Sequence, residues 1–489
     1  MNTTPQASLP PLAPASASLH GHDTVTLAQA MGLLAIVGDL AMGQPIDAST
    51  RAARLAARIA LAAGGDAVAA AHAHMAARLR WSGSTATATG FATLLGDDIG
   101  GRQAMLTRTL SAQQAARLDQ VKHHLTPLAA IHCEVAGDIA AMLGLPAPVE
   151  HGLRHLFERV DGNGVPAVVQ YVVLAGDIEI LTRAHGFSAA LAMVTRLGGV
   201  RYPAALVAQV APHAQAWLAA PDTPDEPFLL PDFLQLSVPL TLVADTVELK
   251  LPWLAGHSRR VALLAQRAAH GLGLPDADQR SLTRAALLHG IGRAAVSNNV
   301  WERRGKPGSA DWEAIRRAPF WTARIGNLID GIEADAQLAS QVHERLDGSG
   351  YYRSLDATTL GMPQRLLAAA AVHVALRSPR PWRAAHEPAS TRALLEAQVT
   401  GGRLDRAAVD AVLAAAATAT VLPPAGQVLS VREVDVLQRL SLGETGKDAA
   451  RAMRISTGAV RTHVESILDK LGCATRAAAT LRALTLGLI

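Results

Sequence analysis

The chain has 489 residues, a formal net charge of +4 and two cysteines, and 49% of its residues are hydrophobic although only 3% are aromatic. Two cysteines cannot form a disulfide framework, and no uncharged apolar run is long enough to span a membrane. These features exclude a disulfide-rich secreted protein and a membrane-spanning protein. We expect a cytoplasmic protein without a membrane partner.

Residues 1–22 lack the basic start and apolar core of a signal peptide, and we expect a disordered tail there. Two proline-rich stretches, APDTPDEPFLLPDF and VLPPAG, predict linkers because proline interrupts helices. At about 150 residues per domain, the length is consistent with three domains. The predicted domains are 23–216, 240–415 and 429–489, and the predicted linkers are 217–239 and 416–428.

The first two domains resemble each other. An offset of 209 residues aligns 50–64 with 259–273 and 75–86 with 284–295, and an offset of 186 aligns 157–166 with 343–352. Both domains are rich in alanine, which is the strongest helix former. We therefore predict an all-α protein whose first two domains are tandem copies of one helical bundle.

Four segments of the second domain carry a family resemblance: ADTVELKLPWLAGHSRRVALLA, AALLHGIGR, VHERLDGSGYYR and AAAVHVALRSPRPWR. Their order and spacing resemble those of HD-GYP domains, which are all-α members of the HD phosphohydrolase superfamily. Many HD-GYP domains hydrolyse cyclic di-GMP with two or three metal ions held by histidines and bridging carboxylates. The resemblance covers nearly all of 240–415.

The resemblance places four histidines of this chain at metal-ligand positions. His257, His289 and His343 stand where the family has histidines, and His373 stands where it has a late aspartate. Arg293 stands where relatives have a lysine that contacts the substrate phosphate. A single divalent transition metal on the four histidines stays open, because imidazole suits such metals. The alternative is that they are leftover histidines, satisfied by hydrogen bonds inside the bundle.

Several ligand positions are lost. Gly290 replaces the aspartate of the His-Asp pair, and Ala318 and Val342 replace two histidines. Without the bridging carboxylates a dinuclear hydrolytic centre is not expected. We assign no catalytic residue and expect no cofactor. Binding of cyclic di-GMP or another nucleotide without cleavage, through Arg293 and the 345–353 loop, also stays open.

The first domain departs further from the family pattern. Ala48 takes the place of the first histidine, and Arg80 and Trp81 take the place of the His-Asp pair. His132 matches a single-histidine position and Asp177 the late aspartate, but no ligand set can be assembled from them. We expect this domain to pack against the second, to dimerise, or to sense a ligand.

The C-terminal domain predicts four short helices. Ser430 and Glu433 form a capping box for the first, and the second covers about 446–453. Ser456 caps the third, and the last begins near Thr475. Two helices joined by the tight MRIS turn are typical of a helix-turn-helix. The segments LSVREVDVL, RIS and VRTHVESILDKLG resemble LuxR-type DNA-binding domains across the whole of 429–489.

By this resemblance, the helix from Thr457 to about Leu471 enters the major groove of DNA. Side chains that reach base edges give sequence choice, and those on phosphates fix the register. The expected base-edge contacts are Arg461, Thr462 and Glu465. The residues expected to hold phosphates or the helix geometry are Lys447, Ser456, His463, Lys470 and Arg476.

These features predict a bacterial transcriptional regulator that binds double-stranded DNA in a sequence-specific way. The HD-GYP-like domains would form a regulatory, dimerising or ligand-sensing body. A homodimer is expected because helix-turn-helix domains usually bind paired half-sites, and a small-molecule or nucleotide ligand is a further candidate partner. The alternative is a metal-dependent cyclic di-GMP phosphodiesterase that carries a DNA-binding domain.

Overall fold

The computed structural model describes residues 23–121, 123, 125–158, 165–220, 231–303, 305–418 and 428–489. Within these ranges the chain is helical apart from one antiparallel pair of short strands, so the predicted all-α class is confirmed. No described helix is both long enough and apolar enough to cross a membrane. The predicted disordered tail lies outside the described residues, as do 221–230 and 419–427 in the two predicted linkers.

The first half of the chain begins with β1 (Thr24–Thr26) and α1 (Leu27–Ala41). It continues with α2 (Ala48–Ala62), α3 (Ala67–Leu79), η1 (Ser82–Thr87), α4 (Ala88–Leu95), α5 (Asp98–Leu106), α6 (Ala112–Val121), α7 (Leu125–Met142), α8 (Ala147–Arg154), α9 (Ala167–His185), α10 (Phe187–Arg196), α11 (Ala204–Val210) and α12 (Ala214–Ala219). The predicted linker at 217–239 therefore begins inside α12, and its described end carries α13 (Pro231–Leu234) and β2 (Ser237–Pro239).

The second half begins with α14 (Thr241–Glu248) and ends at α22 (Arg406–Ala417). Between them lie η3 (Pro252–Leu254), α15 (His257–Gly271), α16 (Asp276–Leu288), η4 (Ile291–Ala295), α17 (Asn298–Trp301), α18 (Ser309–Gly326), α19 (Glu333–Ser340), α20 (Met362–Arg377) and α21 (Pro388–Thr400). The C-terminal helices are α23 (Val431–Ser441), α24 (Gly446–Met453), α25 (Thr457–Leu471) and α26 (Arg476–Thr485).

The two halves have corresponding elements. The first residues of α2 and α15, of α3 and α16, and of η1 and η4 are each 209 positions apart. The buried face of α2 (Ala52, Leu55, Ala56 and Ile59) recurs at this offset in α15 as Val261, Leu264, Ala265 and Ala268. α2 packs on α3 and α9, as α15 packs on α16 and α20. The apolar positions follow the helical period, so each helix buries one face against its neighbours.

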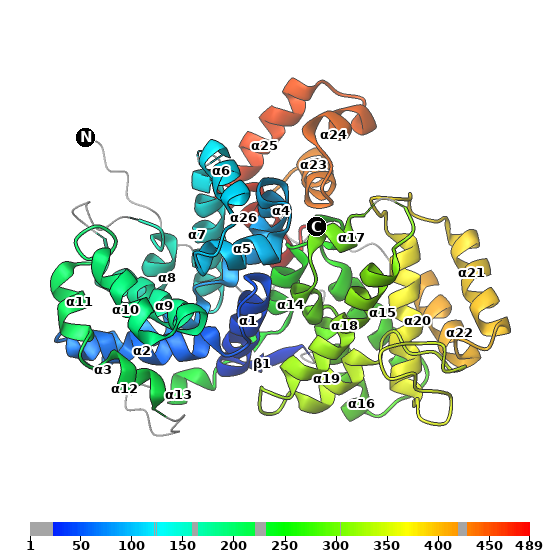
Figure 1. Ribbon diagram of the computed structural model, residues 1–489. Helices are drawn as coiled ribbons and strands as arrows, with labels where there is room; N and C mark the ends of the chain where they lie inside the picture. The colour runs from blue at the N-terminus through cyan, green and yellow to red at the C-terminus, as the bar shows by residue number, and fades with distance from the viewer. Residues whose placement is uncertain are drawn as a thin grey trace.

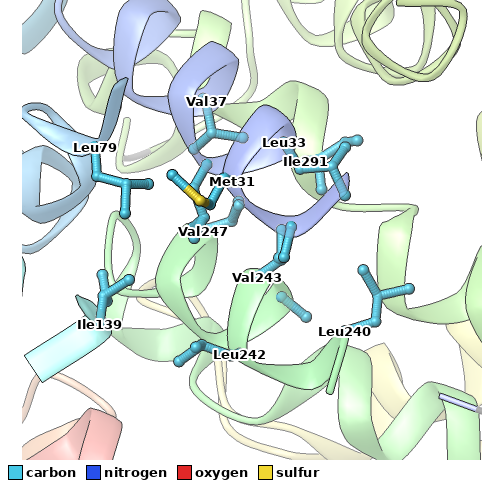
Figure 2. Packing of buried hydrophobic residues seen from close by; sticks show 14 of the residues in the cluster. Met31, Leu33, Val37, Leu79, Ile139, Leu240, Leu242, Val243, Val247 and Ile291 are labelled. Atoms are coloured by element: carbon cyan, nitrogen blue, oxygen red, sulfur yellow. The ribbon is translucent and has the colours of Figure 1, made fainter. Parts of the chain in front are cut away.

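The halves meet at α1 and α14, which contact each other and each contact both η1 and η4. Figure 1 shows α1 between the helices of the first half and those of the second. Figure 2 shows Met31 and Val37 of α1 near Val243 and Val247 of α14, all of them buried. β1 pairs with β2 in the antiparallel sense beside these helices, with Val25 opposite Val238. The hydrophobic core is therefore continuous across both halves.

A buried ion pair also joins the halves. Lys250, just after α14, pairs with Asp98 at the start of α5, and both side chains are almost fully enclosed. The other carboxylate oxygen of Asp98 accepts hydrogen bonds from Ser297 Oγ (3.1 Å) and from the Asn298 backbone N–H (2.8 Å). Asn298 in turn donates to the Lys250 carbonyl (2.9 Å). Burial lowers the pKa of Lys250, and Asp98 opposes this shift.

The C-terminal helices are attached to both halves, chiefly through α26. α26 packs on α7 and α14, and Figure 1 shows α23–α26 on one side of the body. Arg482 of α26 pairs with Asp138 of α7 (3.2 Å), and Arg154 pairs with the same carboxylate (2.7 Å). The Ala474 N–H donates to Glu134. The DNA-binding candidate is thus held by α26, with α25 farther from the body.

The Asp98–Lys250 pair supplies the first testable prediction. Lys250→Met leaves the Asp98 carboxylate buried without its cation and should lower the free energy of unfolding by about 3–5 kcal/mol. Asp98→Asn should have a comparable cost, and the double variant should lose less than the sum of the two. The measurement is urea-induced unfolding of the full chain, analysed as a double-mutant cycle.

The matched control is Arg406→Met, which removes an exposed pair with Asp410 on α22 and should cost about 0–1 kcal/mol. A Lys250→Met cost as small as that of the control would contradict the role given to the buried pair.

Candidate functional site

Four histidines of the second half were expected to share a site, and they come from different elements. His257 is the first residue of α15, His289 follows α16, His343 follows α19, and His373 lies within α20. The rings of His257 and His289 are brought together, with centroids 5.4 Å apart. Among the residues that the structure describes, no three His, Cys, Asp or Glu side chains are arranged to hold a metal ion.

Burial keeps the first three of these histidines neutral. It lowers the pKa of His289 to about 3 and holds the pKa values of His257 and His343 well below the usual range. The Nδ1 atom of His289 is 2.6 Å from the Ala286 carbonyl, so Nδ1–H donates there and Nε2 carries the lone pair. His343 instead stacks on Tyr351, with ring centroids 4.8 Å apart.

An arginine fills the place beside Gly290. A Cβ built on Gly290 would lie only 2.7 Å from Nη1 of Arg293, and 3.7 Å from Ser258 Oγ. Nη1 of Arg293 is buried, and at this distance it occupies the space that the side chain of an aspartate at 290 would need. A fixed positive charge at this point repels a metal cation. The residues present do not fit the dinuclear metal centre of HD-GYP domains.

A buried carboxylate in each half caps the helix that follows it. Glu248 accepts hydrogen bonds from the backbone N–H groups of His257 (2.9 Å) and Ser258 (2.6 Å). Asp39 accepts from the N–H (2.9 Å) and hydroxyl (2.6 Å) of Ser49. Burial raises the pKa of both carboxyl groups to about 7. Sequence reasoning missed this pair, although Asp39 and Ser49 lie 209 positions before Glu248 and Ser258.

Arg80 of the first half lies 209 positions before His289 and so takes the place of that histidine. This buried guanidinium is acted on by the carboxylates of Asp39, Glu179 and Asp177. Its backbone carbonyl accepts a hydrogen bond from His132 Nε2 (2.8 Å), so His132 has a structural partner. Asp177 is bound by Arg201 (2.6 Å) and by the Tyr202 hydroxyl. This arrangement brings a cation together with its counter-ions, and the side chains described in this half form no set of metal ligands.

The C-terminal helices begin and end where the sequence predicts. Ser430 and Glu433 form the expected capping box of α23. Ser456 Oγ accepts from the Ala459 N–H (3.0 Å) and caps α25, and the predicted second helix at 446–453 is α24. The turn between α24 and α25 contains Arg454 in the left-handed region, with φ of 56°. The structure thus confirms two short helices joined by a tight turn.

The face of α25 opposite its buried Val460 and Ile467 is open to solvent. Arg461 and Glu465 are 79% and 68% exposed, and the two are one helical turn apart. The other exposed residues proposed for DNA contact are Lys447, Ser456, Thr457, Thr462, Lys470 and Arg476, whereas His463 is half-buried.

Lys470 is engaged inside the domain. Its ammonium group pairs with Glu433 (2.7 Å), and Ser466 Oγ donates to the same carboxylate (2.6 Å). Burial acts to raise the pKa of Glu433, but the hydrogen bonds from Lys470, Ser466 and Ser430 lower it to about 2. Lys470 therefore holds the helix geometry by tying α25 to α23.

Comparison with known proteins divides the chain in the same way. Residues 241–408 match the HD domain family, and residues 427–483 match the bacterial regulatory proteins of the luxR family. The second half thus contains an HD domain, and the C-terminal helices are a LuxR-type helix-turn-helix domain.

Among curated proteins, the chain is 30% identical to the 3'3'-cGAMP-specific phosphodiesterase 3 of Vibrio cholerae, over 54% of this chain and 62% of that protein. It is 32% identical to the cyclic di-GMP phosphodiesterase response regulator RpfG of Xanthomonas campestris pv. campestris, over 36% and 46%. A probable transcriptional regulatory protein NarL of Mycobacterium tuberculosis is 38% identical over 12% and 28%. The chain thus spans less than two thirds of each of these relatives.

The crystal structure of a cyclic GMP-AMP-specific phosphodiesterase of V. cholerae has a similar fold, with a TM-score of 0.57 and 22% sequence identity. The similarity covers 82% of this chain and 99% of the other. Residues 240–489 make up only about half of the chain, so the likeness in fold extends into the first half.

The raised pKa of Asp39 predicts a pH dependence of stability. Its folded-state pKa, about 7, lies above the ordinary value of 3.8, so its contribution to stability is complete below about pH 4 and is lost as the pH rises through about 7. The buried histidines have lowered pKa values and act in the opposite direction, so the signal is the difference between the wild type and Asp39→Asn. In thermal unfolding, the stability of the wild type relative to Asp39→Asn should fall as the pH rises from about 4 to about 7, whereas its stability relative to Asp410→Asn on exposed α22 should not change with pH. A difference from Asp39→Asn that is constant over this range would refute the prediction.

Proposed function

We propose that this chain is a sequence-specific DNA-binding transcriptional regulator, and that its two halves form a duplicated, non-catalytic HD-GYP-like body. The exposed face of α25 is the observation that carries DNA binding. Arg461 and Glu465 project from a helix whose start is fixed by Ser456 and whose inner face is anchored in the domain. Arginine reads guanine edges and glutamate accepts from cytosine, so this pair suits base recognition in the major groove.

The charge of the domain supports a phosphate-bearing partner. Residues 426–489 contain nine Lys or Arg and six Asp or Glu, a net charge of +3, so the other 425 residues carry +1. Lys447, the second residue of α24, is exposed. Cations around a recognition helix fix its register on the DNA backbone.

Duplication is inferred from side chains as well as helix positions. Asp39 and Glu248 occupy matching positions, and each accepts a hydrogen bond from the N–H of a serine, Ser49 or Ser258, at the second position of the next helix. A shared capping device at the same offset as three pairs of helices is hard to obtain by chance. The antiparallel pairing of β1 with β2 suits two copies related by an approximate two-fold axis.

The non-catalytic role rests on the lost carboxylates. Relatives of the HD domain are named as phosphodiesterases of cyclic dinucleotides. In this chain Gly290 stands at the aspartate of the pair, and the Arg293 guanidinium fills the vacated space. A metal-bridged water is the nucleophile in such hydrolysis, and a cation at the bridging position opposes it.

DNA binding can be tested by selecting target sequences from random double-stranded DNA with the full chain. We expect one sequence to be enriched. Arg461→Ala should then weaken binding to it by about 5- to 150-fold, since one bidentate base contact is worth about 1–3 kcal/mol. Gel-shift titration gives the affinities, and light scattering tests for the expected dimer. Arg392→Ala, an exposed arginine on α21, is the control and should bind normally. Failure to enrich any sequence, or full affinity in Arg461→Ala, would contradict the proposal.

A second candidate function is a metal-dependent cyclic-dinucleotide phosphodiesterase, favoured by the 30% identity to the V. cholerae enzyme and by the adjacent His257 and His289. The test is hydrolysis of cyclic di-GMP and 3'3'-cGAMP under anaerobic conditions with Fe(II) or Mn(II). We expect no turnover above that of His289→Ala. Metal-dependent turnover that this variant abolishes would replace the non-catalytic proposal.

A further inference from the structure

We propose that the outward side of α18 binds single-stranded nucleic acid. Four residues spaced one helical turn apart form this surface, the α18 face: Trp312, Arg316, Phe320 and Arg324. All four are exposed, Trp312 by 43% and Phe320 by 39%. The proposal does not rest on DNA binding by α25, and Figure 1 shows α18 and α25 in separate parts of the molecule.

The opposite side of α18 holds the helix on the body. Ala318 and Thr322 are buried there, and a Cβ built on Gly292 of η4 would overlap the Ala318 carbonyl. The Thr322 hydroxyl accepts a hydrogen bond from the Gly292 N–H (3.2 Å). Because α18 packs on η4 through this side, the α18 face lies on the far side of the helix from η4, which follows His289. It is therefore separate from the altered histidine site.

The arginines of the α18 face have no acidic partner. Among the residues that the structure describes, neither Arg316 nor Arg324 forms an ion pair, and the nearby Asp311 is paired with Arg303 (2.8 Å). Residues 312–324 contain three arginines, all exposed, and one glutamate, a net charge of +2. Such a surface attracts an anionic molecule, and arginine suits a phosphate because its planar fork can donate two hydrogen bonds at once.

Aromatic rings alternate with these arginines. The Phe320 ring lies 5.6 Å from that of Trp321 and 5.9 Å from that of Tyr352, both edge to face, and the Arg324 guanidinium lies 5.9 Å from the Trp321 ring. An unpaired strand has a matching alternation, because every nucleotide carries one phosphate and one base that can stack on an aromatic ring. A duplex keeps its bases stacked inside, and an acidic peptide offers the charge without the rings. The chemistry therefore favours a single strand.

A second copy of this chain does not suit the α18 face. Two copies that pair this helix in the antiparallel sense about Phe320 would bring Arg316 of one copy opposite Arg324 of the other, since each lies four residues from Phe320. A parallel pair would bring each arginine opposite itself. Like charges that face one another across an interface are destabilising. The charge of the face therefore opposes self-association, although exposed apolar side chains in general mark interaction surfaces.

The test is binding of a short fluorescein-labelled oligothymidylate to the full chain, followed by fluorescence anisotropy at several salt concentrations. Each phosphate contact on a single strand contributes about −0.7 to the slope of log K against log salt, so three arginines predict a slope of about −2. The double variant Arg316→Gln/Arg324→Gln should bring the slope to about −0.7 and weaken binding at low salt by about 10-fold or more. Arg392→Gln on α21 is the matched control and should bind as the wild type does.

Stacking is tested separately from charge. Trp312→Ala and Phe320→Ala should each weaken binding by about 5-fold or more, whereas Leu394→Ala, an exposed apolar residue of α21, should not. A base stacked on Trp312 quenches its fluorescence, so saturation with oligothymidylate should quench part of the wild-type tryptophan emission. Trp312→Phe should lose this quenching and still bind within about 3-fold of the wild type, because a second aromatic ring offers the same kind of platform.

Oligouridylate is the second probe, and the tighter binder of the two oligonucleotides identifies RNA or DNA as the strand that is bound. Three results would overturn the proposal: no saturable binding at low salt, unchanged affinity in the arginine double variant, or displacement of the oligonucleotide by polyglutamate as readily as by unlabelled oligothymidylate. The last result would make an acidic protein the partner. The α18 variants should still select the duplex sequence that the wild type selects, so loss of that selection with intact oligothymidylate binding would sink the regulator proposal alone.

Discussion

The buried pair of Asp98 and Lys250 is the constraint that makes the two halves one body. Taking both charges out of water is costly, and their attraction offsets this only when the remaining polar atoms are also satisfied. Here Ser297 and Asn298 supply those partners, so the pair requires α5, α14 and α17 to meet in one arrangement. Burial of the apolar faces of α1 and α14 is also favourable, but the hydrophobic effect is non-directional. The polar network fixes the register.

Within that body, each half holds an arginine on which its capping carboxylate acts: Asp39 acts on Arg80, and Glu248 acts on Arg293. Arg80 of the first half lies near the carboxylates of Asp39, Glu179 and Asp177, which act against its positive charge. Arg293 of the second half enters the space beside Gly290 and finds only Glu248. A Cβ at position 290 would lie 2.7 Å from Arg293 Nη1, so an aspartate at this position and the present placement of Arg293 exclude each other.

Local sequence signals predicted the helices well. The capping box at Ser430 and the helix at 446–453 depend on neighbours a few residues away, and the structure reproduces them. The 209-residue offset is reproduced as well, because each copy of a sequence pattern predicts its own helix. The site was predicted less completely. Asp98 and Lys250 are 152 positions apart, and no local sequence pattern in either segment predicts that they pair. The placement of Arg293 beside Gly290 depends on how η4 turns after α16. Asp39 and Glu248 were detectable, because a carboxylate and a serine ten residues apart recur at the known offset.

The DNA-binding domain is connected to the body through α14 and the residues just before α15. α14 ends at Glu248, which caps α15, and it also packs on α26. Gly256, directly before α15, lies so close to α26 that a Cβ there would be 3.3 Å from Leu484 Cδ2 and 3.0 Å from Arg260 Nη1. One short segment therefore touches the buried His257 at the start of α15 on one side and the helix-turn-helix domain on the other. Because coupling between binding sites is reciprocal, any ligand of the second half that shifts this segment would change the affinity for DNA by the same factor by which DNA changes the affinity for that ligand.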